Sequence, residues 1–157
     1  MNLRSPLFIS LVAQFYMTIF GSIYHDHRHV SGLLTPFGSS GEIVRMVFSG
    51  ELTLYVDARI LAEYREVLLR PKFKFNKEHI STLLDYIRQN SIFLSPSPLK
   101  QHLPDIDDEP FLETAIAGKS SSLITGNLIH YPLELRQGIR VLSPSEFMEF
   151  YRKNAEP

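Results

Sequence analysis

"DIDDEPFLETAIAGKSSSLITGN", residues 105–127, places four acidic side chains in five positions, directly before an apolar helix pattern. That pattern covers residues 109–118, with Pro110 in its first turn and Gly118 at its end, and a short strand pattern follows. Two explanations of the acidic run compete. Asp108 stands where aspartate caps a helix. Crowded carboxylates also repel one another unless a cation compensates, so the run can instead be one wall of a metal site.

Helix and strand patterns alternate along the rest of the chain. Asp57 and Asn76 stand where they can cap helices, Ser39 and Glu42 have capping-box spacing, and Gly50 can end the first of these helices. We expect helices at residues 39–50, 58–70, 77–90, 109–118 and 143–152, and strands at 52–56, 91–94, 122–125 and 139–142. This alternation predicts an α/β fold with a mainly parallel sheet, in which functional sites gather beyond the carboxyl ends of strands.

Bulk composition narrows the class of protein. A chain of 157 residues is the size of one domain with its own core, and its net charge of −1 provides no global field to attract nucleic acid. The absence of cysteine excludes disulfides and thiolate metal sites and fits a reducing compartment, so we expect a cytoplasmic protein.

A local basic run can still contact RNA. "RPKFKFNK" interleaves Arg70, Lys72 and Lys74 with Phe73 and Phe75. Cations of this kind grip phosphates while aromatic rings stack on bases. The alternative is a surface segment whose lysines snorkel and whose rings pack inward.

The N-terminal stretch is unusual. Residues 6–24 carry no charged side chain, which is long enough for a membrane span, although Gln14, Thr18 and Gly21 dilute the signal. We expect a core element or an extension rather than a membrane segment. "HDHRH" follows at residues 25–29; in an extended strand its three histidines would share one face and could suit zinc, but a solvated polar run is the stronger interpretation.

The helix expected after Asp57 separates two glutamates by angle. At about 100° per residue, Glu66 lies roughly 160° from the centre of the apolar stripe and Glu63 only about 100° from it. Glu66 therefore faces water. Glu63 borders the packed face, where it can point into a cleft or pair with a neighbouring arginine on the rim.

Three stretches together resemble the PIN-domain family: "ILAEYREVLLRPKF", the acidic run with its helix and "TGN", and "GIRVLSPSEFMEF". The similarity is greatest to the branch described as toxin components of toxin–antitoxin systems, related to VapC-type toxins. The resemblance covers about residues 30–157, and residues 1–29 form an atypical segment that is either a degenerate first strand or an extension. It implies a three-layer α/β/α sandwich and an endoribonuclease that depends on Mg²⁺ or Mn²⁺.

The site residues implied by the resemblance are Glu63, Asp108 and Asn127, which stands where many members place an aspartate. The first-strand aspartate of the family falls on His25 without a gap, or on Asp26 with one deletion and "IFGSIYH" as the first strand. Glu63, Asp108 and Asp26 are the expected metal ligands, with Asn127 orienting a ligand or water, and the neutral Asn127 predicts weak binding of a hard dication. The other acids of the run, Asp105, Asp107 and Glu109, are interpreted as solvated loop charge. RNA is the expected substrate, and an antitoxin protein and a homodimer remain open as partners. The alternative function is a non-catalytic module of the same fold.

Overall fold

A parallel sheet forms the centre of the protein. The computed structural model describes residues 7–11, 38–71 and 74–155. Within them, five strands pair in the order β3-β2-β1-β4-β5, and every pair is parallel. The strands are β1 (Leu7–Leu11), β2 (Leu52–Val56), β3 (Ile92–Phe93), β4 (Ser122–Ile124) and β5 (Val141–Leu142). The predicted α/β class and parallel sheet are confirmed, although all five strands are short.

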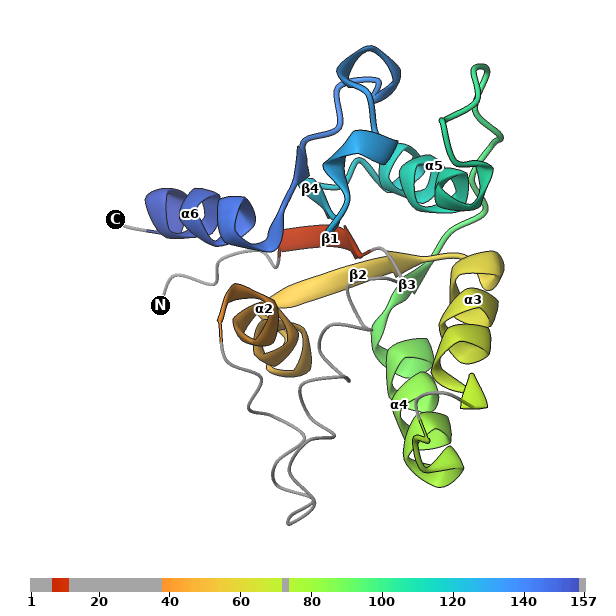
Figure 1. Ribbon diagram of the computed structural model, residues 1–157. Helices are drawn as coiled ribbons and strands as arrows, with labels where there is room; N and C mark the ends of the chain where they lie inside the picture. The colour runs from red at the N-terminus through yellow and green to blue at the C-terminus, as the bar shows by residue number, and fades with distance from the viewer. Residues whose placement is uncertain (1–6, 12–37, 72–73, 156–157) are drawn as a thin grey trace.

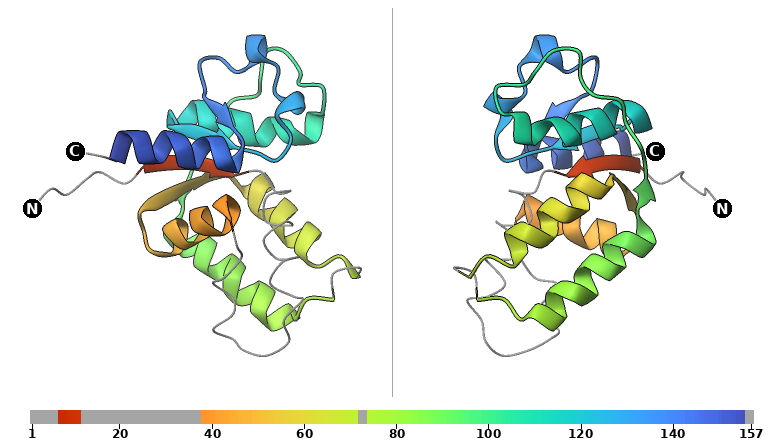
Figure 2. Two further views of the ribbon diagram at one scale, coloured as in Figure 1. Left: turned by 60° about the vertical axis from the view of Figure 1, so that its left-hand side comes forward. Right: turned by 90° about the vertical axis from the view of Figure 1, so that its right-hand side faces the viewer.

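Helices flank this sheet on two sides. In Figures 1 and 2, α5 lies on one side of β1 and β2, whereas α2, α3 and α4 lie on the other. The helices are α2 (Ser39–Phe48), α3 (Ala58–Leu68), α4 (Lys77–Asn90), α5 (Glu109–Gly118) and α6 (Pro144–Ala155). Each agrees with an expected helix to within a few residues at either end.

The helix ends show which capping predictions were right. A carboxylate oxygen of Asp57 accepts a hydrogen bond from the Ile60 amide at 2.9 Å, and Asn76 Oδ1 accepts one from the Glu78 amide at 2.8 Å. Gly50 follows α2 with a φ of 79°, the left-handed conformation that glycine adopts most easily. The capping box was wrong, because the N-cap of α2 is Gly38 and no side chain caps it.

Large side chains fill the space between the sheet and its helices. Tyr64, Phe111, Tyr131 and Phe147 are among the largest fully buried side chains. The end of α5 comes especially close to the sheet: a Cβ at Gly118 would lie 2.6 Å from the ring of Tyr55. Glycine is needed there to let the helix pack.

The N-terminal stretch contributes the middle strand. β1 pairs with β2 on one edge, Ile9 opposite Leu54, and with β4 on the other, Ile9 opposite Ser122. The alternative first strand at residues 19–25, and the histidines of residues 25–29, lie outside the described residues. Within the described part of the chain, no helix is both long and apolar enough to span a membrane.

Candidate metal centre

The acidic run folds into a 3₁₀ turn, η3 (Ile106–Asp108), that leads directly into α5. Asp105 caps this turn, since its side chain accepts a hydrogen bond from the Asp107 amide at 3.0 Å. Asp108 occupies the N-cap position of α5 but makes no capping hydrogen bond with its side chain. The capping interpretation of Asp108 was therefore wrong, and its carboxylate is free to take part in something else.

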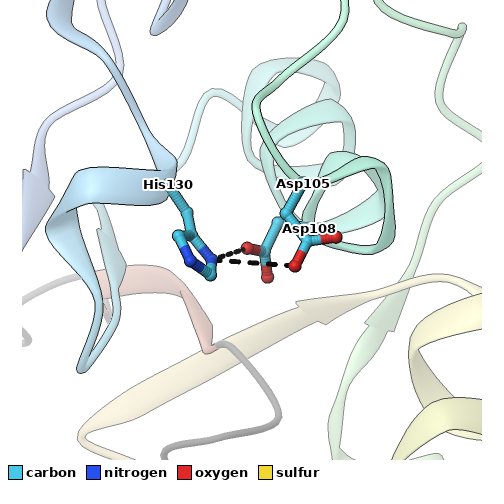
Figure 3. Close-up of side chains that lie close together, drawn as sticks. All are labelled: Asp105, Asp108 and His130. Carbon is cyan, nitrogen blue, oxygen red and sulfur yellow. Dashed lines mark hydrogen bonds and ion pairs between the residues drawn. The ribbon is translucent and has the colours of Figure 1, made fainter.

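The carboxylate of Asp108 pairs with His130. This histidine ends η4 (Leu128–His130), a 3₁₀ turn that follows β4. Nδ1 of His130 lies 2.6 Å from Oδ2 of Asp108 and 3.9 Å from Oδ2 of Asp105. Figure 3 shows the imidazole facing the two carboxylates across the gap between η4 and the start of α5. The three residues thus form a compact cluster built from two loops.

Asn127 extends the cluster on its other side. Its Nδ2 lies 2.7 Å from Nε2 of His130. With Asp108 ionised, Nδ1 of His130 carries the proton and donates it to the carboxylate, while Nε2 accepts from the Asn127 amide. The result is a chain of two hydrogen bonds, Asn127 to His130 to Asp108, that fixes the imidazole in one plane.

Glu63 lies near this cluster on α3. Partial burial, together with the negative charges of Asp108 and Asp107, raises the pKa of Glu63 to about 7. Glu66, by contrast, leaves 76% of its side chain exposed and pairs with Arg70 at 3.6 Å. The angular argument therefore placed the two glutamates correctly relative to solvent.

The half-buried setting also affects Asp108 itself. Burial raises the pKa of the Asp108 carboxyl, and the hydrogen bond from His130 opposes that rise. Tyr131, fully buried beneath the cluster, places its hydroxyl 3.5 Å from the backbone oxygen of Asp108. Burial and the charge of Asp108 raise the pKa of Tyr131, so its hydroxyl stays protonated.

Other acids of the same region are structural. Glu109 is buried and accepts a hydrogen bond from the Leu103 amide at 3.0 Å, with Nδ1 of His102 at 2.9 Å. Glu109 thereby ties the proline-rich loop at residues 95–104 to α5. The expectation that the run apart from Asp108 is solvated loop charge was thus wrong for Glu109 and for the half-buried Asp105, and right for the exposed Asp107.

Arg59 neutralises two more carboxylates. Its Nε donates to Oδ2 of Asp57 at 2.8 Å, and its guanidinium forms an ion pair with the buried Glu113 at 2.7 Å. Asp57 and Glu113 already have a cation, so they are poor candidates for holding a second one.

The predicted RNA contacts follow α3, and the charge of Arg70 is close enough to Glu63 to oppose the rise in its pKa. Arg70 follows α3, and Lys74 is exposed in the loop between α3 and α4, with a φ of 50°. Lys72 lies outside the described residues, as does Asp26, the fourth predicted member of the catalytic set. Among the predicted site residues that the structure does describe, Asp108 and Asn127 meet at His130, and Glu63 interacts electrostatically with Asp108.

The end of β1 lies beside this cluster without supplying an acid. Leu11 is paired with Ile124, the last residue of β4 before the loop that carries Asn127. In the sequence, no acidic residue occurs before β1 or within it, and the first one after it is Asp26. Neither β1 nor the residues that directly adjoin it in the sequence therefore supply the first-strand aspartate that the resemblance implies.

Sequence reasoning missed Asp105 and His130. Asp105 was grouped with solvated charge, and His130 was not considered. A signal for His130 existed: it follows Asn127 by three residues, a spacing that a single 3₁₀ turn brings onto one side. The reason for forming such a turn there, rather than an extended loop, is not evident from the residues alone.

The donor atoms fit a divalent cation. One ligand atom each from Asp105, Asp108 and His130 lies within 4.8 Å of the other two, and Glu63 adds negative charge nearby. Carboxylate oxygens with one imidazole nitrogen suit first-row divalent metals, and water can complete the coordination of such ions.

Comparison with protein families gives a match. A family model described as the PIN domain matches residues 29–128. The search of curated proteins found no match. The matched region contains Glu63, Asp105, Asp108 and Asn127 and stops two residues before His130.

Proposed function

Because the chain belongs to the PIN-domain family, we propose that it is a divalent-metal-dependent endoribonuclease of the toxin type found in toxin–antitoxin systems. The proposal includes the family's three-layer α/β/α sandwich, with residues 30–157 as the domain, RNA as substrate, and an antitoxin protein or a second copy as partner. One observation supports it above the others. Glu63 and Asp108, from separate elements, are both half-buried, and Asp108 is close enough to Glu63 for its charge to raise the pKa of Glu63.

The chemistry assigned to the site is hydrolysis of a phosphodiester. Bound metal would supply a water of lowered pKa and offset the charge that develops on the phosphate oxygens. The water oxygen forms a bond to phosphorus as the bridging P–O bond breaks, and the leaving oxygen takes up a proton. Asp108, with Glu63, would hold the metal, and the chain from Asn127 through His130 would keep the Asp108 carboxylate aimed at it.

A direct assay tests this proposal. The full chain is stripped of metal and incubated with fluorescent single-stranded RNA of mixed sequence, with Mn²⁺ or with EDTA. We expect cleavage with Mn²⁺ alone, and its loss in Asp108→Asn. Asp107→Asn is the matched control, because it removes the same charge from an exposed neighbour in the same turn. Cleavage that survives in EDTA or in Asp108→Asn would contradict the proposal.

The second candidate is a non-catalytic module that binds RNA or an antitoxin. It is favoured by the lack of any acidic residue between the start of the chain and Asp26. A site missing the first-strand carboxylate holds a hard dication less strongly, because fewer anionic oxygens face it. Unchanged RNA after long incubation with Mn²⁺, combined with measurable RNA binding, would select this function.

A further inference from the structure

We infer that His130 is itself a metal ligand and that it makes the site select a transition-metal dication, such as Mn²⁺ or Co²⁺, over Mg²⁺. The inference rests on the proposed function for the presence of a metal, and goes beyond it in naming the ligand atom and the metal class. It adds Asp105 and His130 to the predicted ligands Asp108 and Glu63; Asp26, the other predicted ligand, lies outside the described residues.

Nδ1 of His130 is placed to be the ligand atom. This nitrogen lies 2.6 Å from Asp108 and 3.9 Å from Asp105, so it faces the space that the two carboxylates share. In the metal-free protein a proton on Nδ1 occupies that space and offsets part of their charge. A metal ion takes the place of that proton, and neutral imidazole is a common ligand for transition metals.

Asn127 is placed to orient the imidazole of His130. Histidines that bind metals through one nitrogen are oriented by a hydrogen bond at the other, usually to an oxygen acceptor. Nε2 of His130 lies 2.7 Å from the amide of Asn127. When a metal displaces the proton from Nδ1, the neutral imidazole carries its proton on Nε2, and a turn of the Asn127 amide presents Oδ1 to accept a hydrogen bond from it. The same residue therefore holds the imidazole in both states.

The small number of acidic residues at the site favours a transition metal over Mg²⁺. Asn127 is neutral where the family resemblance implies an aspartate, and no acid adjoins β1 in the sequence. A hard ion such as Mg²⁺ depends on anionic oxygens and gives up its water reluctantly, so it loses most from these changes. Ions later in the first transition row gain more from a nitrogen ligand, so His130 retains them.

Metal titration of the full chain tests the inference. The metal-free protein is titrated calorimetrically with Mg²⁺, Mn²⁺ and Co²⁺ in separate runs. We expect Co²⁺ and Mn²⁺ to bind at least about tenfold more tightly than Mg²⁺. His130→Gln should weaken Co²⁺ binding by about ten- to a hundredfold while changing Mg²⁺ binding by less than about threefold. His102→Gln is the matched control, since His102 also contacts a carboxylate but lies outside the cluster.

Spectroscopy supplies a readout that does not depend on activity. With ¹⁵N-labelled histidine, pulsed EPR of bound Mn²⁺ should show nitrogen coupling in the wild type and in His102→Gln, but not in His130→Gln. Asn127→Ala keeps the ligand but frees the ring, and should lower Co²⁺ affinity by roughly tenfold. If His130→Gln fails to fold, His130→Ala and Asn127→Ala provide the same comparison.

The outcomes separate this inference from the proposed function. His130-dependent Co²⁺ binding without RNA cleavage would support the inference and refute the ribonuclease. Cleavage supported equally by Mg²⁺ and Mn²⁺, and unchanged in His130→Gln, would support the ribonuclease and overturn the inference. Failure to bind any of the three ions, or Mn²⁺ bound without nitrogen coupling, would also overturn it.

Discussion

Glu63 and Glu66 stand one helical turn apart on α3, yet their surroundings differ sharply. Glu63 is half-buried among the negative charges of Asp107 and Asp108, whereas Glu66 extends into solvent. A carboxylate kept close to other carboxylates is destabilised unless a cation or a proton compensates its charge. We therefore assign Glu63 to the site and Glu66 to the surface.

Replacing each glutamate in turn by neutral glutamine distinguishes the two. Glu63→Gln should reduce Mn²⁺-dependent RNA cleavage by at least about a hundredfold, because the proposed metal loses a nearby anionic oxygen. Glu66→Gln should stay within about twofold of the wild type, since its pair with Arg70 is exposed. Initial cleavage rates at saturating Mn²⁺ provide the measurement. Equal losses in the two variants would show that Glu63 has no special position.

The raised pKa of Glu63 also predicts how stability changes with pH. Its pKa rises on folding from 4.5 to about 7, so between these values the unfolded chain loses the proton while the folded chain keeps it. The unfolded state then binds fewer protons, and the free energy of unfolding falls as pH rises from about 4.5 to about 7. Below about pH 4.5 and above about pH 7, Glu63 does not change the free energy of unfolding with pH.

Urea unfolding in EDTA at pH 5 and pH 8 tests this expectation. Glu63→Gln should lose less stability than the wild type between the two pH values, because glutamine does not titrate. Glu66→Gln is the control and should follow the wild type. Parallel pH profiles for all three proteins would mean that Glu63 titrates normally in the folded state.

At single positions, the sequence predicted which side of a helix a residue faces better than it predicted contacts between loops. Glu63 was placed from helical periodicity, because a regular helix fixes angles. Asp108 was expected to cap α5, but its carboxylate reaches His130, a residue in a different loop. Contacts between loops depend on how the strands between them pack, and no local pattern encodes that. His130 was missed for this reason.

At the scale of elements, the close approach of α5 to the sheet is the tightest restraint. A Cβ on Gly118 would meet the Tyr55 ring at 2.6 Å and Leu94 at 2.8 Å. The helix therefore settles onto β2 only because its last residue has no side chain. This approach also fixes the direction of α5, whose N-cap residue is Asp108.

Gly118→Ala should lower the free energy of unfolding by about 1–3 kcal/mol, as is typical when a methyl group is forced into a packed core. Gly126→Ala is the matched control, because a Cβ there would meet nothing within 4 Å. Guanidinium unfolding of both variants and the wild type measures the difference. An alanine at position 118 that costs no more than one at position 126 would show that Tyr55 and Leu94 move aside readily.

Elements with caps and amphipathic faces were predictable, and β1 was not. The helices α2 to α6 each show a periodic apolar face or a recognisable end in the sequence. A strand in the middle of a parallel sheet is covered on both faces, so it reads as a continuous apolar run without alternation. "LFISL" has that character, and its neighbours are equally apolar, so the pattern does not mark where the strand begins or ends.

At the scale of the whole molecule, charge restricts how RNA can bind. The net charge is −1, and the candidate metal centre is itself acidic. RNA, the proposed substrate, would therefore need a basic region to bind. The residues Arg70, Lys72 and Lys74 are the proposed region, and Arg70 is partly committed to Glu66.

The double variant Lys72→Gln with Lys74→Gln should weaken binding of single-stranded RNA and flatten its dependence on salt. If each lysine contacts one phosphate, the slope of log K against log salt should fall in magnitude by about 1.4. Lys100→Gln with Lys153→Gln removes two exposed cations elsewhere and should leave the slope unchanged. Fluorescence anisotropy across a salt series provides the data. Equal slopes in both double variants would assign residues 70–77 to ordinary surface.

The central position of β1 has a consequence for how the protein is made. This strand is synthesised before the other four described strands, but Ile9 pairs with Ser122 on one side and Leu54 on the other. A ribosome adds about 5–20 residues per second, so the β4 partner emerges on the order of ten seconds after β1. During that interval the sheet cannot form around its middle strand, and the apolar residues of β1 in the nascent chain lack their β4 partner. A chaperone that shields residues 6–24 during synthesis should therefore raise the yield of folded protein more than one added after release.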